Sequence, residues 1–207
     1  MTIEEQEKIK EFRKQLQNCE KNTNEYGFKA IGGFVYKFAN GFAYTLNIRV
    51  PEKKPFSIYV ILTFKPLVLD DLFWDIFEIK SARVKPKSFH IDGAFTAPDA
   101  LLKFWENPIN DDFKNLYGEI LKEADNIINE YSKKINNLDA FQSHIKSHKY
   151  QLLNYILVEI YKKDYKNALM MLDDAIQRKD PCVVSFMDSD GKTFFEYAQD
   201  YCKGKSF

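Results

Sequence analysis

The chain begins with a helical pattern of apolar positions. Ile9, Phe12 and Leu16 recur at intervals of three or four residues, and charged or polar residues fill most of the positions between them. Such spacing places the apolar side chains on one face of a helix. The pattern therefore predicts an amphipathic helix over residues 3–20.

The next segment changes to an alternating, β-rich pattern. Two runs rich in aromatic and β-branched residues, 34–38 and 42–50, are separated by Asn40-Gly41. This dipeptide accepts the positive φ angles of a type I′ turn, so it is a strong hairpin signal. Residues 56–64 form a third and almost wholly apolar run. We expect an antiparallel meander, with residues 28–31 as a further strand at one edge.

Residues 69–108 give weaker signals. Apolar positions in 69–79 share one helical face, and the basic stretch 80–87 is typical of a solvated loop. Residues 88–95 are compatible with a fourth strand of the sheet. A hydroxyl followed by an early proline in 96–99 is typical of a helix start, which predicts a short helix ending near residue 107.

The C-terminal half is dominated by helical patterns. One apolar stripe continues through residues 113–135, and shorter helices are expected from residue 139 onward, with a tight corner at 162–164. The expected fold class is α+β: an N-terminal helix packed on an antiparallel β-meander of three to five strands, followed by a helical C-terminal subdomain. We expect a sheet domain at 1–110 and a helical subdomain at 111–207, and one continuous domain stays open.

Composition and charge narrow the classes of function. The 207 residues carry 30 Lys and Arg against 30 Asp and Glu, so the chain lacks the basic excess that binding to nucleic acid needs. The N-terminus has no secretory pattern, and charges interrupt the most apolar stretch, so we expect no membrane partner. Three widely spaced cysteines predict reduced thiols rather than a disulfide framework. We expect a cytoplasmic protein.

Two partial resemblances point toward binding roles. Leu169 and Leu172, the turn at 188–193 and Ala198 make residues 150–203 resemble an ankyrin-type helical hairpin, which implies helix packing rather than an activity. The N-terminal order of helix, Gly27-Phe28 and Asn-Gly hairpin resembles uncharacterised bacterial α+β domains. Some of these are similar to immunity proteins of toxin systems, and that resemblance implies a partner-binding role.

The helix after Pro66 supplies the strongest candidate interaction surface. A helical wheel of residues 69–79 gathers one tryptophan and four carboxylates opposite the apolar positions. An exposed tryptophan is typical of a binding hot spot, and the acids favour a basic partner. The alternative is that the tryptophan packs inward and the acids lie at the rim. The candidate partner-binding residues are Asp70, Asp71, Trp74, Asp75 and Glu78.

A second hypothesis is an enzyme or a small-ligand-binding protein with a pocket between the sheet and the helices. Tyr36, Arg49 and His90 are the candidate pocket residues. We find no catalytic motif and expect no cofactor. His144 and His148 lie four residues apart, yet their lysine-rich surroundings favour a polar helix face over a metal site.

The balance of these patterns favours a non-catalytic protein-interaction module, either an immunity-like protein or a regulatory partner of another protein. A deep concavity would favour the ligand-binding alternative. The oligomeric state stays open, because an amphipathic stripe does not say whether it packs within one chain or between chains.

Overall fold

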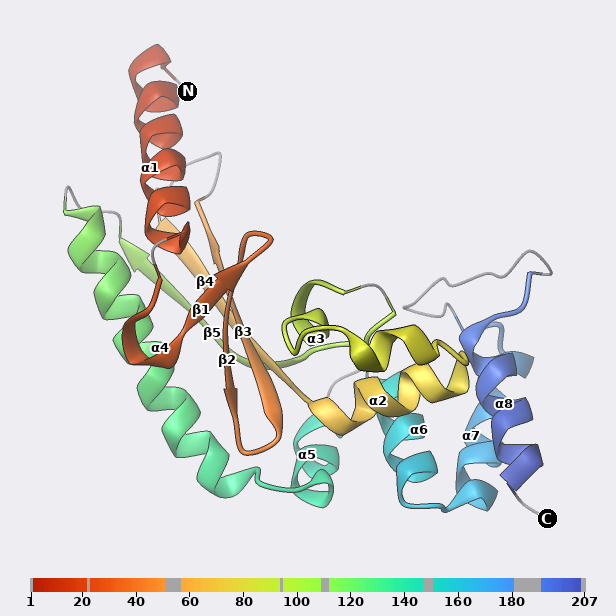
Figure 1. Ribbon diagram of the computed structural model, residues 1–207. Coiled ribbons are helices and arrows are strands. Elements are labelled where there is room, and N and C mark those ends of the chain that lie inside the picture. The colour runs from red at the N-terminus through yellow and green to blue at the C-terminus, as the bar shows by residue number, and fades with distance from the viewer. Residues whose placement is uncertain are drawn as a thin grey trace. The chain divides into compact units, whose positions relative to one another are not determined.

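The computed structural model confirms the α+β class (Figure 1). It describes residues 2–21, 23–50, 57–93, 95–108, 112–146, 151–180 and 191–205. The chain divides into two compact units, each assembled from two segments. The first comprises Met1–Phe64 and Leu101–Lys134, and the second comprises Lys65–Ala100 and Ile135–Phe207. The helix at residues 113–134 thus groups with the sheet. This grouping differs from the expected division into a sheet domain at 1–110 and a helical subdomain at 111–207.

The first unit contains nearly all of a five-stranded antiparallel sheet in the order β1-β2-β3-β4-β5. Its strands are β1 (Lys29–Ile31), β2 (Phe34–Ala39), β3 (Phe42–Arg49), β4 (Ser57–Pro66) and β5 (Ala100–Pro108). The predicted hairpin is confirmed: Asn40 and Gly41 have φ angles of 50° and 80°, as a type I′ turn requires. The register pairs Ala39 with Phe42 across that turn.

Two helices and one short turn complete the first unit. They are α1 (Ile3–Lys21), the 3-10 turn η1 (Glu25–Gly27) and α4 (Phe113–Lys134). Phe12 on α1 meets Phe113 on α4 with ring centroids 6.1 Å apart. The Lys37 ammonium on β2 lies 2.5 Å from Asp125 on α4, and the register places Lys37 opposite Tyr44 on β3. Helix α4 therefore lies over the sheet face that carries Tyr44.

The second unit is helical. Its elements are α2 (Leu67–Ile76), the 3-10 turn η2 (Lys80–Val84), α3 (Phe89–Asp92), α5 (Leu138–Ile145), α6 (Leu152–Tyr161), α7 (Tyr165–Gln177) and α8 (Phe194–Lys205). Phe73 on α2 stacks on Phe194 on α8 with ring centroids 4.7 Å apart and planes 5° apart. The predicted corner between α6 and α7 is confirmed, because the Asp164 side chain caps α7 by accepting from the Asn167 amide.

Two expectations for residues 88–108 were wrong. Residues 89–92 form the short helix α3 instead of a strand, and residues 100–108 form strand β5 instead of a helix. Residues 80–84 form the 3-10 turn η2, and residues 83–87 are exposed, as expected of a solvated connector. The hydroxyl and proline at 96–99 lie in extended chain rather than at a helix start. Pairing at the sheet edge outweighs this local signal, as tertiary contacts often do.

Candidate functional site

Trp74 is not the exposed anchor that the sequence predicts. Only 3% of its surface is accessible, and its ring packs against Phe89 and His90 on α3, with centroid distances of 5.7 and 4.8 Å. Helix α2 therefore buries two sides, one through Phe73 toward α8 and one through Trp74 toward α3. The expectation of an open tryptophan ringed by carboxylates is wrong, because α3 covers that side of the helix.

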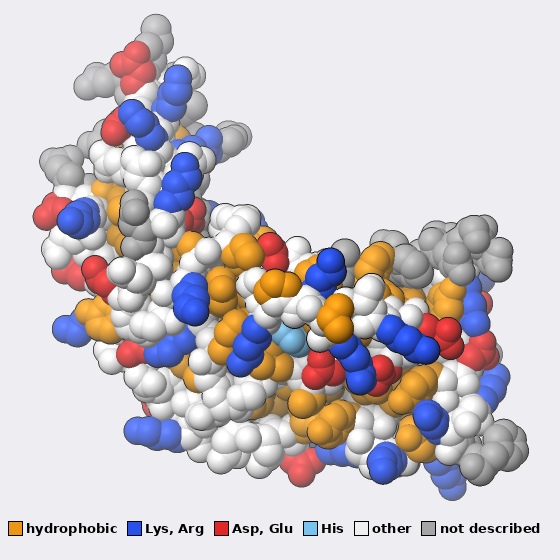
Figure 2. Space-filling model, viewed as in Figure 1, with side chains coloured by type: hydrophobic (Ala, Val, Ile, Leu, Met, Phe, Trp, Pro, Cys, Tyr) orange, Lys and Arg blue, Asp and Glu red, His pale blue; other side chains and the backbone are white. Residues whose placement is uncertain are grey.

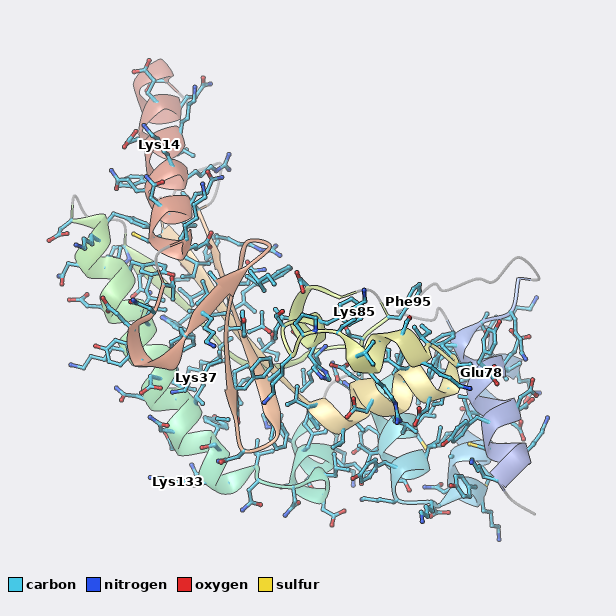
Figure 3. All side chains as sticks on the ribbon, in the orientation of Figure 1. Lys14, Lys37, Glu78, Lys85, Phe95 and Lys133 are labelled. Carbon is cyan, nitrogen blue, oxygen red and sulfur yellow. The ribbon has the colours of Figure 1, made fainter. Side chains whose placement is uncertain are left out.

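The remaining acids of this helix do not form an uncompensated patch. Asp71 is half-buried, and Asp75 forms an ion pair with Arg83 from η2. Glu78 is exposed and lies just beyond the end of α2 (Figure 3). Acidic and basic side chains lie beside one another over α2 and η2 (Figure 2). Their charges offset each other, so this surface gives little long-range attraction for a basic partner.

Asp70 is the centre of a buried polar network. Its Oδ2 lies 3.2 Å from the Lys65 ammonium and 2.9 Å from His90 Nδ1, and its Oδ1 accepts from the Ala97 amide at 2.6 Å. Lys65 also donates to the Ala97 carbonyl at 3.2 Å and lies 3.7 Å from Asp99 Oδ1. One carboxylate therefore connects the end of β4, α2, α3 and the chain that leads into β5.

This network stabilises the fold, but its residues do not by themselves form a catalytic site. The Asp70 bond directs His90 Nδ1 inward, which leaves Nε2 as the nitrogen free for other contacts. A metal site would need further ligands, and within the described ranges no group of three or more His, Cys, Asp or Glu could hold an ion. His148 lies outside those ranges. Phe95 has a φ of 61°, a costly angle for a bulky residue, and the Ala97 bonds hold the following chain in place.

The candidate pocket residues have separate local partners. In the first unit, Tyr36 is buried and its ring meets Phe38 at 5.3 Å, whereas Arg49 is exposed and donates to the Asn47 side chain at 3.1 Å. His90 belongs to the second unit and to the Asp70 network. The structure thus joins His90 with Asp70 and Trp74, which the sequence had assigned to a different hypothesis.

Strand β5 carries exposed side chains that the sequence analysis missed. It is an edge strand of nine residues, and from Leu101 to Pro108 only Leu102 is buried. Phe104 is 48% exposed and stacks on Tyr59 of β4 at 6.0 Å. The aromatic pair Phe104-Trp105 favours a strand and was the available signal.

In the part of the chain that the structure covers, no helix combines the length and apolarity needed to cross a bilayer. The comparisons with known proteins give no relative. No family model matches the sequence, and no curated protein or solved structure matches the chain.

Proposed function

We propose that the protein is a non-catalytic protein-interaction module and that strand β5 is its docking element. The observation that carries this proposal is the exposure of a nine-residue strand at the sheet edge, with no further described strand beside it. The opposite edge strand, β1, has only three residues. An extended segment of a partner can therefore add to the sheet along β5.

Strand addition uses the backbone groups that an edge strand leaves unpaired. Main-chain hydrogen bonds supply affinity, and alternate side chains supply specificity. Exposed edges also promote aggregation, and natural proteins limit this with charged residues and proline. Lys103, Glu106 and Pro108 provide such protection on β5. These residues disfavour nonspecific strand pairing along β5, while a partner strand with complementary side chains can still pair with it.

The side chains of β5 define the partner's chemistry. Successive residues point to opposite faces, so Leu101 and Lys103 share one face while Phe104 and Glu106 share the other. A matching strand carries an acidic residue opposite Lys103, and an apolar and a basic residue opposite Phe104 and Glu106. The partner is a protein with an exposed strand or extended tail of this pattern. This chain acts by covering that strand or tail of the partner.

The free thiols support a cytoplasmic setting for the proposed role. Cys19 and Cys202 are free thiols in the structure, which supports a reducing compartment such as the cytoplasm. Strand addition would block a partner by steric occlusion and needs no cofactor. This mode agrees with the immunity-like role that the N-terminal resemblance implies.

Affinity capture with matched variants tests the proposal. Phe104→Glu places a charge in the docking strand, and Met170→Glu makes the same change at a 64% exposed apolar residue on α7. Tagged protein from its native cells should retain a stoichiometric partner in the wild type and in Met170→Glu, and lose it in Phe104→Glu. Lys103→Glu should weaken capture as well. Equal retention by Phe104→Glu would contradict the proposal, provided that all variants keep unfolding free energies within about 0.5 kcal/mol.

A further inference from the structure

A small pocket opens in the first unit between the end of α1, η1 and α4. Its volume is about 110 Å³. It is lined by Cys19, Thr23, Glu25, Lys114, Tyr117, Gly118 and Leu121. An apolar cavity of roughly 150 Å³ can hold benzene, so this smaller site suits a ligand of at most about six non-hydrogen atoms.

Gly118 forms part of the pocket wall in the second turn of α4. Glycine in a helix interior costs about 1 kcal/mol relative to alanine. Close packing does not require it here, because a Cβ at Gly118 would meet no atom within 4 Å. The missing side chain instead keeps the pocket open. Tyr117 and Leu121 are buried residues that line the same site.

A chain of hydrogen bonds fixes the polar character of the wall. The Thr23 hydroxyl donates to the Cys19 carbonyl at 2.9 Å and also contacts the Tyr117 hydroxyl. A threonine hydroxyl has a single proton, so Tyr117 is the donor in the second contact. The Tyr117 oxygen therefore keeps lone pairs that can accept a hydrogen bond from a ligand.

Two opposite charges complete the lining. Lys114 and Glu25 are both exposed, and neither side chain has an ion-pair partner among the described residues. A cation alone would be repelled by Lys114, and an anion alone by Glu25. A molecule with both charges can pair with each side chain and place its apolar part toward Gly118 and Leu121.

We propose that this pocket binds a small zwitterion of the chemical class of a short α-amino acid. Its carboxylate faces Lys114, and its ammonium group faces Glu25 and the Tyr117 hydroxyl oxygen. This function is independent of docking at β5, because the pocket residues come from other elements of the chain.

Titration of the full-length, isotope-labelled protein by NMR tests the assignment with three probes. L-Alanine is the zwitterion, while propionate and n-propylamine each keep one charge. A ligand of this size binds weakly, so saturable shifts of the 19–25 and 114–121 amides are expected at millimolar concentration. Propionate and n-propylamine should bind at least about threefold more weakly, because each leaves one charged side chain of the pocket without its partner.

Two glycine variants separate pocket filling from general effects. Gly118→Leu fills the pocket, whereas Gly204→Leu adds the same side chain to α8 at another helical glycine whose Cβ would meet nothing within 4 Å. L-Alanine binding should be lost in Gly118→Leu and unchanged in Gly204→Leu. The proposal is overturned by an absence of saturable shifts up to roughly 50 mM, by unchanged binding in Gly118→Leu, or by equal affinity for the singly charged probes.

Discussion

The Asp70 carboxylate lies 3.2 Å from the Lys65 ammonium, and both side chains are almost completely buried. Removing two charges from water is costly, and such a pair persists only when further hydrogen bonds satisfy it. Asp70 accepts additional bonds from His90 and the Ala97 amide, and Lys65 donates to the Ala97 carbonyl. The pair therefore holds together four chain segments around α2.

Loss of the Asp70 charge is expected to destabilise the protein strongly. Asp70→Asn leaves the buried Lys65 ammonium with only the more distant, partly exposed Asp99 carboxylate as a counter-ion, which should lower the free energy of unfolding by about 3–5 kcal/mol. Asp71→Asn is the matched control, because its half-buried carboxylate has no ion-pair partner within the described ranges, and the change should alter stability by less than about 0.5 kcal/mol. Chemical denaturation measures the free energy of unfolding of both variants. A similar loss of stability in the two would contradict the stabilising role of the Asp70–Lys65 pair.

Trp74 should behave as a core residue. Trp74→Ala removes a ring that packs on Phe89 and His90, so the free energy of unfolding should fall by about 3–5 kcal/mol. Trp74→Phe should lower the free energy of unfolding by less, because it keeps an aromatic ring and removes an indole N–H that is buried with no acceptor in the described part of the chain. Denaturation curves for Trp74→Ala that overlay the wild type would show that the side chain is exposed after all.

Tyr44 offers a stabilising substitution. Its ring stacks on Phe64 at 6.0 Å, while its hydroxyl is buried without a hydrogen-bond partner among the described residues. Burial also raises the pKa of Tyr44 to about 12. Tyr44→Phe keeps the stacking and removes the unsatisfied hydroxyl, so the free energy of unfolding should stay equal or rise by about 1–2 kcal/mol. A clear decrease in the thermal midpoint would reveal an unrecognised partner of this hydroxyl.

Glu20 should make stability depend on pH. Burial raises the pKa of this carboxyl from 4.5 to about 7. The folded state therefore binds a proton that the unfolded state has released, and stability falls as pH rises from 4.5 to about 7. Solvent screening at this half-buried site limits the effect to the order of 1 kcal/mol. Glu20→Gln should unfold at higher denaturant than the wild type above pH 7 and lose that advantage at pH 4.5; a constant difference would contradict the assignment.

The sequence pattern predicted correctly those elements that depend on residues close together in the chain. The stripe of α4 and the Asn40-Gly41 turn needed no distant contacts to be recognised. Strand β5 was missed because its identity depends on pairing with β4, and the preceding proline suggested a helix start. The helical wheel of residues 69–79 shows which side chains share a face of α2, but it could not show that α3 covers Trp74.

The pocket beside Gly118 had no recognisable pattern in the sequence either. Its lining combines Cys19, Thr23 and Glu25 with residues of α4 that are far away along the chain, and the two sets meet only in the fold. One local sign was available, because Gly118 is a glycine inside an otherwise helical pattern.

Hydrogen–deuterium exchange of the captured complex tests docking at β5 most directly. Backbone amides of an edge strand become protected when a partner strand pairs with them. We predict slower exchange at the amides of residues 100–107 in the complex than in the free protein, and no change in α7. Equal exchange of the β5 amides with and without the partner would contradict the account.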